Sequence, residues 1–416
     1  MWRAGQTLAL ATLIMLAFSV AASILGIPQA DVGPSLEFNW RAFIGGERST
    51  SVPVYIKIIG GRVGVALYNG SNYTTTLVVL DGDGTAAFKA SYTHSTPLCL
   101  ANYQGSFDLI MDRGGGDVYE KILTANGEES DGFSFKTARP ALLSGCTVHG
   151  GTYYFYGTVA VEGRGMEAYV EARTQAGRLL WNISWGSSSG DEGVLDLVPL
   201  GGDLIAVVEN ASNTSWLGIY VLAGGKAVKL LEAEGYHYAS GTPLNESLAA
   251  LSFNTPRIPQ ILLVHAQNYE LTVVNITGIN VHLTGIAGSG GILTVSGFEA
   301  NTTTGAREGV VFLIDPKTGV ISSVNRITGK NDVTPLIIDA QRGQVAVSGL
   351  YGSRPFTASY SIIWPGGVSP TSTNPPPGSS GEGFKRVYIV VGGVVAVLIV
   401  ASIIYYVRRG GRASPK

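Results

Sequence analysis

Two twelve-residue segments of the chain match each other in pattern, and this internal repeat constrains the fold more than any other feature. Residues 60–71 (GGRVGVALYNGS) align without a gap with residues 201–212 (GGDLIAVVENAS), at an offset of 141 residues, which is three times 47. Related strand starts recur with a mean step of 47 residues and single steps of 35 to 55. They lie near Val63, Leu98, Tyr153, Leu204, Leu248, Leu293 and Val345. A repeat of about 40 to 50 residues that holds about four strands is typical of a β-propeller blade, so seven starts predict seven blades.

The sequence between these starts predicts an all-β protein whose ring closes through its two ends. Short apolar runs alternate with turns rich in Gly, Asn and Asp, and runs such as 204–208 and 310–314 are apolar throughout, which predicts strands covered on both faces. The last unit stops after residues 359–364 without a fourth strand, whereas residues 36–43 form a strand with no preceding blade. The N-terminal strand is therefore predicted to complete the last sheet. A two-domain β-sandwich is the alternative.

The N-terminus predicts export. Residues 8–25 are apolar apart from one threonine and two serines, and they follow the single basic residue Arg3. Small residues typical of a signal-peptidase site come next. We interpret residues 1–30 as a signal peptide, with an uncleaved signal anchor as the alternative, because 18 apolar residues are at the lower limit for crossing a membrane.

The C-terminus predicts a single membrane span. Residues 387–407 carry no charge over 21 residues, which is about 31 Å as a helix, so residues 385–407 are predicted as a transmembrane helix with a basic flank. The basic tail 408–416 predicts a cytoplasmic C-terminus and an extracytoplasmic body at the cell membrane. Within the span, Gly392 and Ala396 form a small-x-x-x-small pair that is compatible with a weak homodimer.

Between body and span, residues 365–384 are rich in Pro, Gly, Ser and Thr and predict an extended stalk. Residues 31–364 are then the ectodomain. Residues 31–384 hold 21 Lys and Arg against all 30 Asp and Glu, so the exported part carries a net charge of −9 while the whole chain carries −2. An acidic surface of this kind argues against phosphate backbones as partners, and no nucleic-acid binding is predicted.

Eight Asn-x-Ser/Thr sequons predict glycosylated surface loops in an exported chain. Composition alone would give about three, so their number is an excess. The alternative interpretation is that Asn-Gly-Ser and Asn-Thr-Thr are favourable turn sequences. The candidates are Asn69, Asn72, Asn182, Asn210, Asn213, Asn245, Asn275 and Asn301.

Cys99 and Cys146 are the only cysteines, and 47 residues, one repeat, separate them. In an oxidising compartment such a pair predicts a disulfide between neighbouring blades, with buried free thiols as the alternative. Two cysteines and five scattered histidines predict no metal site.

Two further motifs have both a functional and a structural interpretation. Residues 81–84 (DGDG) resemble the start of a calcium loop, but the remaining ligands are missing, so a hairpin turn is favoured. Trp181, Trp185, Trp216 and residues 153–156 (YYFY) would suit a carbohydrate-stacking platform, but aromatic residues between stacked sheets usually serve packing.

A resemblance supports the propeller. The hairpin at residues 311–323, an apolar strand followed by Asp-Pro-Lys-Thr-Gly and a second apolar strand, resembles blades of the PQQ-like and YVTN-like propeller superfamily, as do residues 177–181 followed by 201–206. The stalk, the span and the sequons resemble those of single-pass archaeal-type cell-surface glycoproteins. The tryptophan-docking repeats of quinoprotein dehydrogenases have no regular counterpart here, so the resemblance implies no cofactor.

These features predict a membrane-anchored β-propeller that serves as a surface recognition, scaffold or assembly module for protein or glycan partners. The alternative is an extracytoplasmic propeller enzyme, a hydrolase or lyase acting on glycans, with its site at the mouth of the central channel. No catalytic residue is predicted, because the sequence shows no Gly-x-Ser-x-Gly elbow, phosphate loop or paired-carboxylate motif. A cluster of carboxylates from different blades at that mouth would favour the enzyme.

Overall fold

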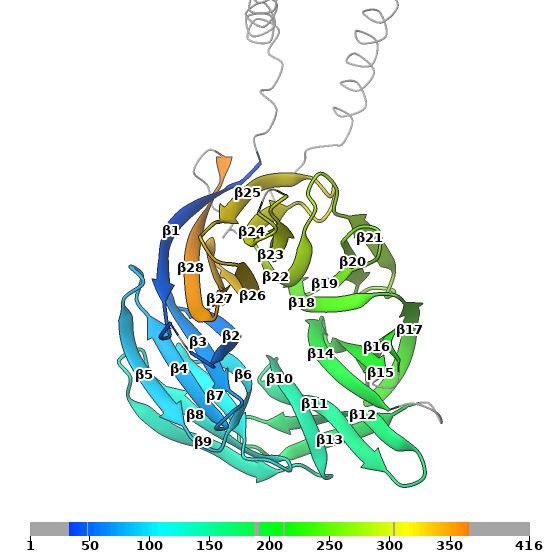
Figure 1. Cartoon of the computed structure of the whole chain (residues 1–416). Coiled ribbons are helices and arrows are strands. Elements are labelled where there is room, and N and C mark those ends of the chain that lie inside the picture. Colours follow the sequence, from blue (N-terminus) through cyan, green and yellow to red (C-terminus); the bar gives the residue numbers. More distant parts are fainter. Residues whose placement is uncertain (1–32, 48, 187–190, 211–212, 303, 366–416) are drawn as a thin grey trace, which may run out of the picture. The chain divides into compact units, whose positions relative to one another are not determined.

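The structure, a computed structural model, describes residues 33–365 except 48, 187–190, 211–212 and 303. The described residues form seven antiparallel sheets of four strands, arranged side by side in a ring (Figure 1). The first strand of each sheet is innermost, and it contacts the innermost strands of the two neighbouring sheets all the way around. The predicted seven-bladed β-propeller is thereby confirmed, and the two-domain β-sandwich is wrong, because all seven sheets share one ring.

The blades are numbered in chain order, and their strands are given from the inner to the outer edge. Blade 1 consists of β2 (Val52–Ile59), β3 (Arg62–Asn69), β4 (Thr74–Leu80) and β5 (Ala86–Tyr92). Blade 2 consists of β6 (Thr96–Tyr103), β7 (Ser106–Asp112), β8 (Asp117–Leu123) and β9 (Glu129–Lys136). Blade 3 consists of β10 (Ala141–His149), β11 (Thr152–Val161), β12 (Gly165–Thr174) and β13 (Leu179–Trp185). Blade 4 consists of β14 (Glu192–Leu200), β15 (Asp203–Asn210), β16 (Asn213–Ala223) and β17 (Lys226–Glu234). Blade 5 consists of β18 (His237–Asn245), β19 (Leu248–Asn254), β20 (Gln260–His265) and β21 (Leu271–Asn275). Blade 6 consists of β22 (His282–Ser289), β23 (Ile292–Ala300), β24 (Arg307–Ile314) and β25 (Ile321–Ile327). Blade 7 consists of β26 (Val333–Gln341), β27 (Gln344–Tyr351), β28 (Arg354–Ile363) and β1 (Ser35–Phe43).

The two middle strands of each blade are largely buried, because adjacent blades cover both of their faces. In β15 the run from Leu204 to Val208 is buried at every position, as its continuous apolar character predicts. The second strands begin 44 to 52 residues apart, a narrower spread than the predicted 35 to 55. The prediction placed Leu98 in line with Val63, whereas Leu98 lies on the innermost strand β6 and Phe107 of β7 corresponds to Val63.

The N-terminal strand closes the ring, as predicted. β1 is the outermost strand of blade 7 and runs antiparallel to β28, with Ser35 opposite Ile363 and Phe43 opposite Phe356. Each blade has a turn end, where its first strand turns into its second, and a loop end, where its second strand passes to the third and its last strand leads to the next blade. Since β1 starts and β28 finishes at the turn end, the described part of the chain enters and leaves the ring there.

Each innermost strand carries a β-bulge at the same place, and the residue after it is called the post-bulge position. These positions are Tyr55, Cys99, Gly145, Asp196, Ser240, Gly285 and Ile337. Two of them accept a backbone hydrogen bond from the next blade: Asp196 Oδ2 from Gly241 N at 3.2 Å, and Ser240 Oγ from Ile286 N at 2.7 Å. In both cases the donor is one residue beyond the next blade's post-bulge position, so these bonds fix the spacing of adjacent blades around the channel.

Several predictions from the sequence concern residues that lie outside the described part of the chain. These are the signal segment 1–30, almost all of the stalk 365–384, the predicted span 385–407 with Gly392 and Ala396, and the tail 408–416. Within residues 33–365, no helix has the length and apolar character needed to cross a membrane.

Candidate functional site

The loop end of the ring contains a pocket between blades 3 and 4 with a volume of about 260 Å³. Three carboxylates line it: Asp191 precedes β14, Glu192 is the first residue of β14, and Glu209 lies near the end of β15. The apolar side chains of Met166, Val194 and Leu195 form much of the remaining wall. We call this cavity the acidic pocket.

Blade 3 adds a fourth carboxylate beside the acidic pocket. Glu167 of β12 is 3% exposed and accepts hydrogen bonds from Ser184 Oγ at 2.8 Å and Arg164 Nη1 at 3.1 Å. Gly186 lies between the two blades, and a Cβ atom there would stand 3.1 Å from Cγ of Glu167 and 3.3 Å from Oε2 of Glu192, which is only 2% exposed. The missing side chain at Gly186 therefore lets carboxylates from two blades approach each other.

The acidic pocket suits a cationic group attached to an apolar body. The lining contains no Lys or Arg that would offset these negative charges. Arg164, which pairs with Glu167, has a side chain that is 65% exposed. Charge-assisted hydrogen bonds from an ammonium or guanidinium group to carboxylates are stronger than neutral ones, and apolar walls hold the remainder of a ligand. Asp191 is already oriented, since its Oδ1 accepts a hydrogen bond from Met166 N at 3.0 Å.

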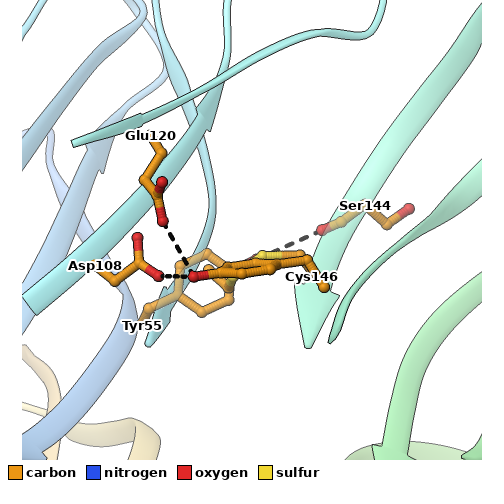
Figure 2. Close-up of a disulfide and its surroundings, with 7 residues drawn as sticks. Tyr55, Asp108, Glu120, Ser144 and Cys146 are labelled. Carbon is orange, nitrogen blue, oxygen red and sulfur yellow. Dashed lines mark hydrogen bonds between the residues drawn. A yellow bond between two sulfur atoms is a disulfide. The ribbon is translucent and has the colours of Figure 1, made fainter. Parts of the chain in front are cut away.

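The inner end of the acidic pocket reaches the central channel. Ser144 and Leu195 both line the pocket. The backbone carbonyl of Ser144 accepts a long hydrogen bond of 3.5 Å from the hydroxyl of Tyr55, which comes from blade 1 (Figure 2). Leu195 is the bulged residue directly before Asp196. On its channel side the pocket is therefore bordered by Leu195 of blade 4 and by Ser144 of blade 3, whose carbonyl Tyr55 contacts.

Asp196 is the centre of a hydrogen-bonded group in this channel. Its Oδ2 accepts from the hydroxyl of Tyr238 at 2.5 Å as well as from Gly241 N. Burial raises the pKa of Asp196, and the same burial, together with the Asp196 charge, raises the pKa values of Tyr156 and Tyr238. Gly145 leaves the space that the Tyr156 hydroxyl occupies. Blades 3, 4 and 5 thus meet at one carboxyl group.

Replacing Asp196 by alanine is expected to lower the free energy of unfolding by about 2 kcal/mol, because a buried phenol and a backbone N–H lose their acceptor. Asp196→Asn retains a carbonyl acceptor and should cost clearly less. Urea denaturation of both variants checks the expectation. Equal losses for alanine and asparagine would show that Asp196 acts through its charge rather than as an acceptor.

Cys99 and Cys146 form a disulfide that joins the innermost strands of blades 2 and 3, with their Cα atoms 5.3 Å apart (Figure 2). Cys99 occupies a post-bulge position, and Cys146 lies one residue beyond the post-bulge position of the next blade. The disulfide therefore links blades 2 and 3 at the same position at which the hydrogen bonds accepted by Asp196 and Ser240 link blade 4 to blade 5 and blade 5 to blade 6.

A buried pair of acids lies next to this disulfide, and sequence reasoning missed it. Asp108 of β7 is fully buried, Glu120 of β8 is 3% exposed, and the hydroxyl of Tyr153 donates to both, at 2.7 Å and 3.1 Å (Figure 2). Burial, and then the hydrogen bond and charge of Glu120, raise the pKa of Asp108 to about 9. Asp108 is therefore protonated at neutral pH. The three residues lie on three strands of two blades, so no local motif signals them.

The glycosylation candidates are distributed unevenly over the ring. The Asn72, Asn182, Asn245 and Asn275 side chains are exposed, and those of Asn69, Asn210 and Asn301 are half-buried. All of these except Asn182 and Asn245 lie at the loop end, together with Asn213 at the start of β16. Their glycosylation stays a prediction.

The other two motifs have structural roles here. Asp81 pairs with Arg62 at 2.7 Å, and Asp83 accepts a hydrogen bond from Thr85 N at 2.9 Å, so residues 81–84 form the turn between β4 and β5. The aromatic residues pack between strands: Tyr153 and Phe155 are buried, Tyr154 contacts Trp181, and Trp185 contacts Tyr220. The favoured packing interpretation describes them well.

Comparison with known proteins relates this chain to other propellers by fold. The sequence matches no protein-family model and no curated protein. A puromycin hydrolase structure aligns with a TM-score of 0.51 at 10% identity, covering 73% of this chain and 50% of the hydrolase. The acylaminoacyl peptidase of Pyrococcus horikoshii aligns with a TM-score of 0.51 at 12% identity, covering 78% of this chain and 53% of the peptidase. The chain thus spans about half the length of these proteins, and the likeness shows the fold.

These comparisons correct the functional prediction. The expected surface recognition, scaffold or assembly module is contradicted, because the similar propellers are parts of a hydrolase and a peptidase. The alternative prediction was a propeller enzyme acting on glycans, whereas these two proteins are a hydrolase and a peptidase, at identities that show the fold alone. Together, the fold and the site define a seven-bladed propeller with an acidic pocket at its loop end. The resemblance to the PQQ-like and YVTN-like superfamily stays a prediction.

Proposed function

We propose that this chain is a peptidase-like hydrolase whose propeller binds the substrate, and that the acidic pocket binds the protonated amino end of the substrate peptide. The observation that carries the proposal is the clustering of three carboxylates at the loop end of blade 4 in one pocket, whose apolar wall comes from blades 3 and 4. A peptide's amino end combines an ammonium group with an apolar or polar side chain one bond away. The pocket offers partners for both parts.

The likeness to a hydrolase and a peptidase supports the choice of a peptide rather than a glycan. Carboxylates also accept hydrogen bonds from sugar hydroxyls, but a neutral sugar has no cationic group that would balance the charge of the acidic pocket. The hydrolytic step adds water across an amide bond, and no residue is assigned as its nucleophile or base.

We further propose that the predicted span anchors the protein in the cell membrane, with the propeller on the extracytoplasmic side. The predicted stalk and span follow residue 365, and β28 reaches Ile363 at the turn end of the ring. The acidic pocket lies at the opposite, loop end.

The double variant Asp191→Asn with Glu209→Gln tests the peptide proposal, because it removes two charges while it keeps the shapes and the hydrogen bond to Met166 N. We expect about tenfold weaker binding of a peptide with a free amino end and a similar fall in its rate of cleavage. Calorimetry measures the affinity and mass spectrometry the cleavage, both with the full-length chain in detergent.

Glu128→Gln is the matched control, because Glu128 is exposed at the turn end of blade 2 and should leave both readings unchanged. An N-acetylated peptide should bind the unmodified protein about as weakly as the free peptide binds the double variant. Equal affinity for free and acetylated peptides would refute the role of the acidic pocket. Binding without any cleavage would refute the hydrolase.

A further inference from the structure

A second pocket lies at the loop end, on the far side of the ring from the acidic pocket. It has a volume of about 340 Å³ and is formed where β1 closes blade 7: Phe43 is the last residue of β1, Tyr351 the last of β27, and Arg354 the first of β28. Glu47, Asn331 and Ser353 complete the lining. Two blades separate blade 7 from the blades of the acidic pocket in either direction around the ring, blades 1 and 2 on one side and blades 5 and 6 on the other. We call this cavity the arginine pocket.

Arg354 is held in place by contacts that leave part of its guanidinium group unused. Its Nε donates to the backbone carbonyl of Gly45 at 3.0 Å, and its Cζ lies 4.1 Å from the centre of the Phe43 ring. Within the described part of the chain, neither Nη atom of Arg354 has a hydrogen-bond partner. A half-buried guanidinium fixed by one nitrogen and by stacking is preorganised to bind a carboxylate.

A second arginine adds positive charge at the same place. Arg41 of β1 lies near the rings of Phe43 and Tyr351, at 5.8 Å and 5.7 Å, and its Nη1 donates to the carbonyl of Thr328 at 3.4 Å. The lining itself contains one arginine, Arg354, and one carboxylate, that of Glu47, so Arg41 beside the lining supplies the excess positive charge. The arginine pocket therefore has a positive balance, whereas the acidic pocket has a negative one.

We infer that the arginine pocket binds a carboxylate of the same peptide whose amino end occupies the acidic pocket, so that the substrate lies across the mouth of the ring. The inference rests on the proposed function and adds the substrate class: peptides with a free amino end and a carboxylate far enough away to reach blade 7. The two pockets share the loop end and have opposite charge balance, which matches the opposite charges of a peptide's ends. The carboxylate is the C-terminus or an acidic side chain, and the two sources are separable by experiment.

The test couples one change in the protein to one change in the peptide. Peptides of increasing length with uncharged side chains are prepared with a free or an amidated C-terminus, and their affinities for the full-length chain are measured by calorimetry. For peptides long enough to span the mouth, amidation should weaken binding about tenfold, and Arg354→Gln should weaken binding of the free acid about tenfold. Both changes together should be no worse than either one alone.

Two further proteins make the result specific. Arg354→Lys keeps the charge and the packing stem but loses the planar fork, so its affinity should lie between those of the unmodified protein and Arg354→Gln. Arg257→Gln changes an exposed arginine at the loop end of blade 5 and should bind like the unmodified protein. Circular dichroism melts show whether each variant is folded, and the lysine variant keeps the test valid if the glutamine variant is not.

The outcomes separate this inference from the proposed function. The arginine pocket does not hold a carboxylate if amidation of the peptide has no effect, or if it weakens binding to the unmodified protein and to Arg354→Gln equally. The proposed function survives that result if N-acetylation of the peptide still weakens binding. If an amidated peptide with a glutamate near its end regains the lost affinity, the carboxylate is a side chain. If N-acetylation also has no effect, the proposed function itself fails.

Discussion

Replacing Cys99 and Cys146 together by alanine is expected to lower the free energy of unfolding by about 4 kcal/mol. The disulfide closes a loop of 47 residues, and cross-linking a loop of that length removes much of the conformational freedom of the unfolded chain. It also ties blades 2 and 3 together at the post-bulge position, where alanine offers no substitute for the bond. Urea denaturation under oxidising conditions measures the loss.

Two controls show whether the covalent bond itself is responsible. The unmodified protein treated with a reductant should fall to within about 1 kcal/mol of the double variant. Ser240→Ala removes the hydrogen bond that occupies the equivalent place between blades 5 and 6, and it should cost only about 1 kcal/mol. If the oxidised protein and the double variant unfold at the same urea concentration, the disulfide contributes nothing to stability.

The ring could be predicted from the sequence because the propeller repeats one local unit. Each second strand begins after a tight turn, often a Gly-Gly pair such as that at residues 60–61, and is buried on both faces, so apolar runs recur at an almost constant spacing. Closure was predictable as well, since a unit with three strands and a lone N-terminal strand fit together. The misplacement of Leu98 arose because innermost strands are also apolar, so a run of hydrophobic residues does not say which strand of a blade it forms.

The candidate site could not be predicted because its residues come together only through the packing of blades. Glu167 and Glu192 lie 25 positions apart on different blades, and nothing in either neighbourhood distinguishes them from the other carboxylates of an acidic chain. The arginine pocket depends on the contact of the first strand with the last, which brings Phe43 beside Arg354. No signal in the sequence indicated Gly186, because residues 186–190 (GSSSG) are typical of a loop, and only the structure shows that its missing side chain serves the close approach of two blades.

The buried acids make the folded protein lose stability as the pH rises, which is the second large effect that we expect. The pKa of Asp108 is about 9 in the folded chain and close to its ordinary value of 3.8 when the chain is unfolded. Between these values the folded state binds one more proton than the unfolded state. The contribution of Asp108 to the free energy of unfolding is fully present below its pKa in the unfolded chain and is lost as the pH rises through its pKa in the folded chain. Between about pH 5 and pH 8 the free energy of unfolding should fall by at most about 1.4 kcal/mol for each pH unit because of Asp108.

Asp108→Asn isolates this contribution, because an amide resembles the protonated acid in shape and cannot ionise. The stability of the variant, measured by urea denaturation from about pH 5 to pH 8, should fall less with pH than that of the unmodified protein, and the difference between the two slopes belongs to Asp108. Glu128→Gln, which changes a carboxylate outside the buried pair, should keep the slope of the unmodified protein. Identical slopes for all three proteins would mean that Asp108 ionises in the folded state at neutral pH. In that case the hydrogen bond from the Tyr153 hydroxyl, rather than a retained proton, would hold the Asp108 carboxylate between blades 2 and 3.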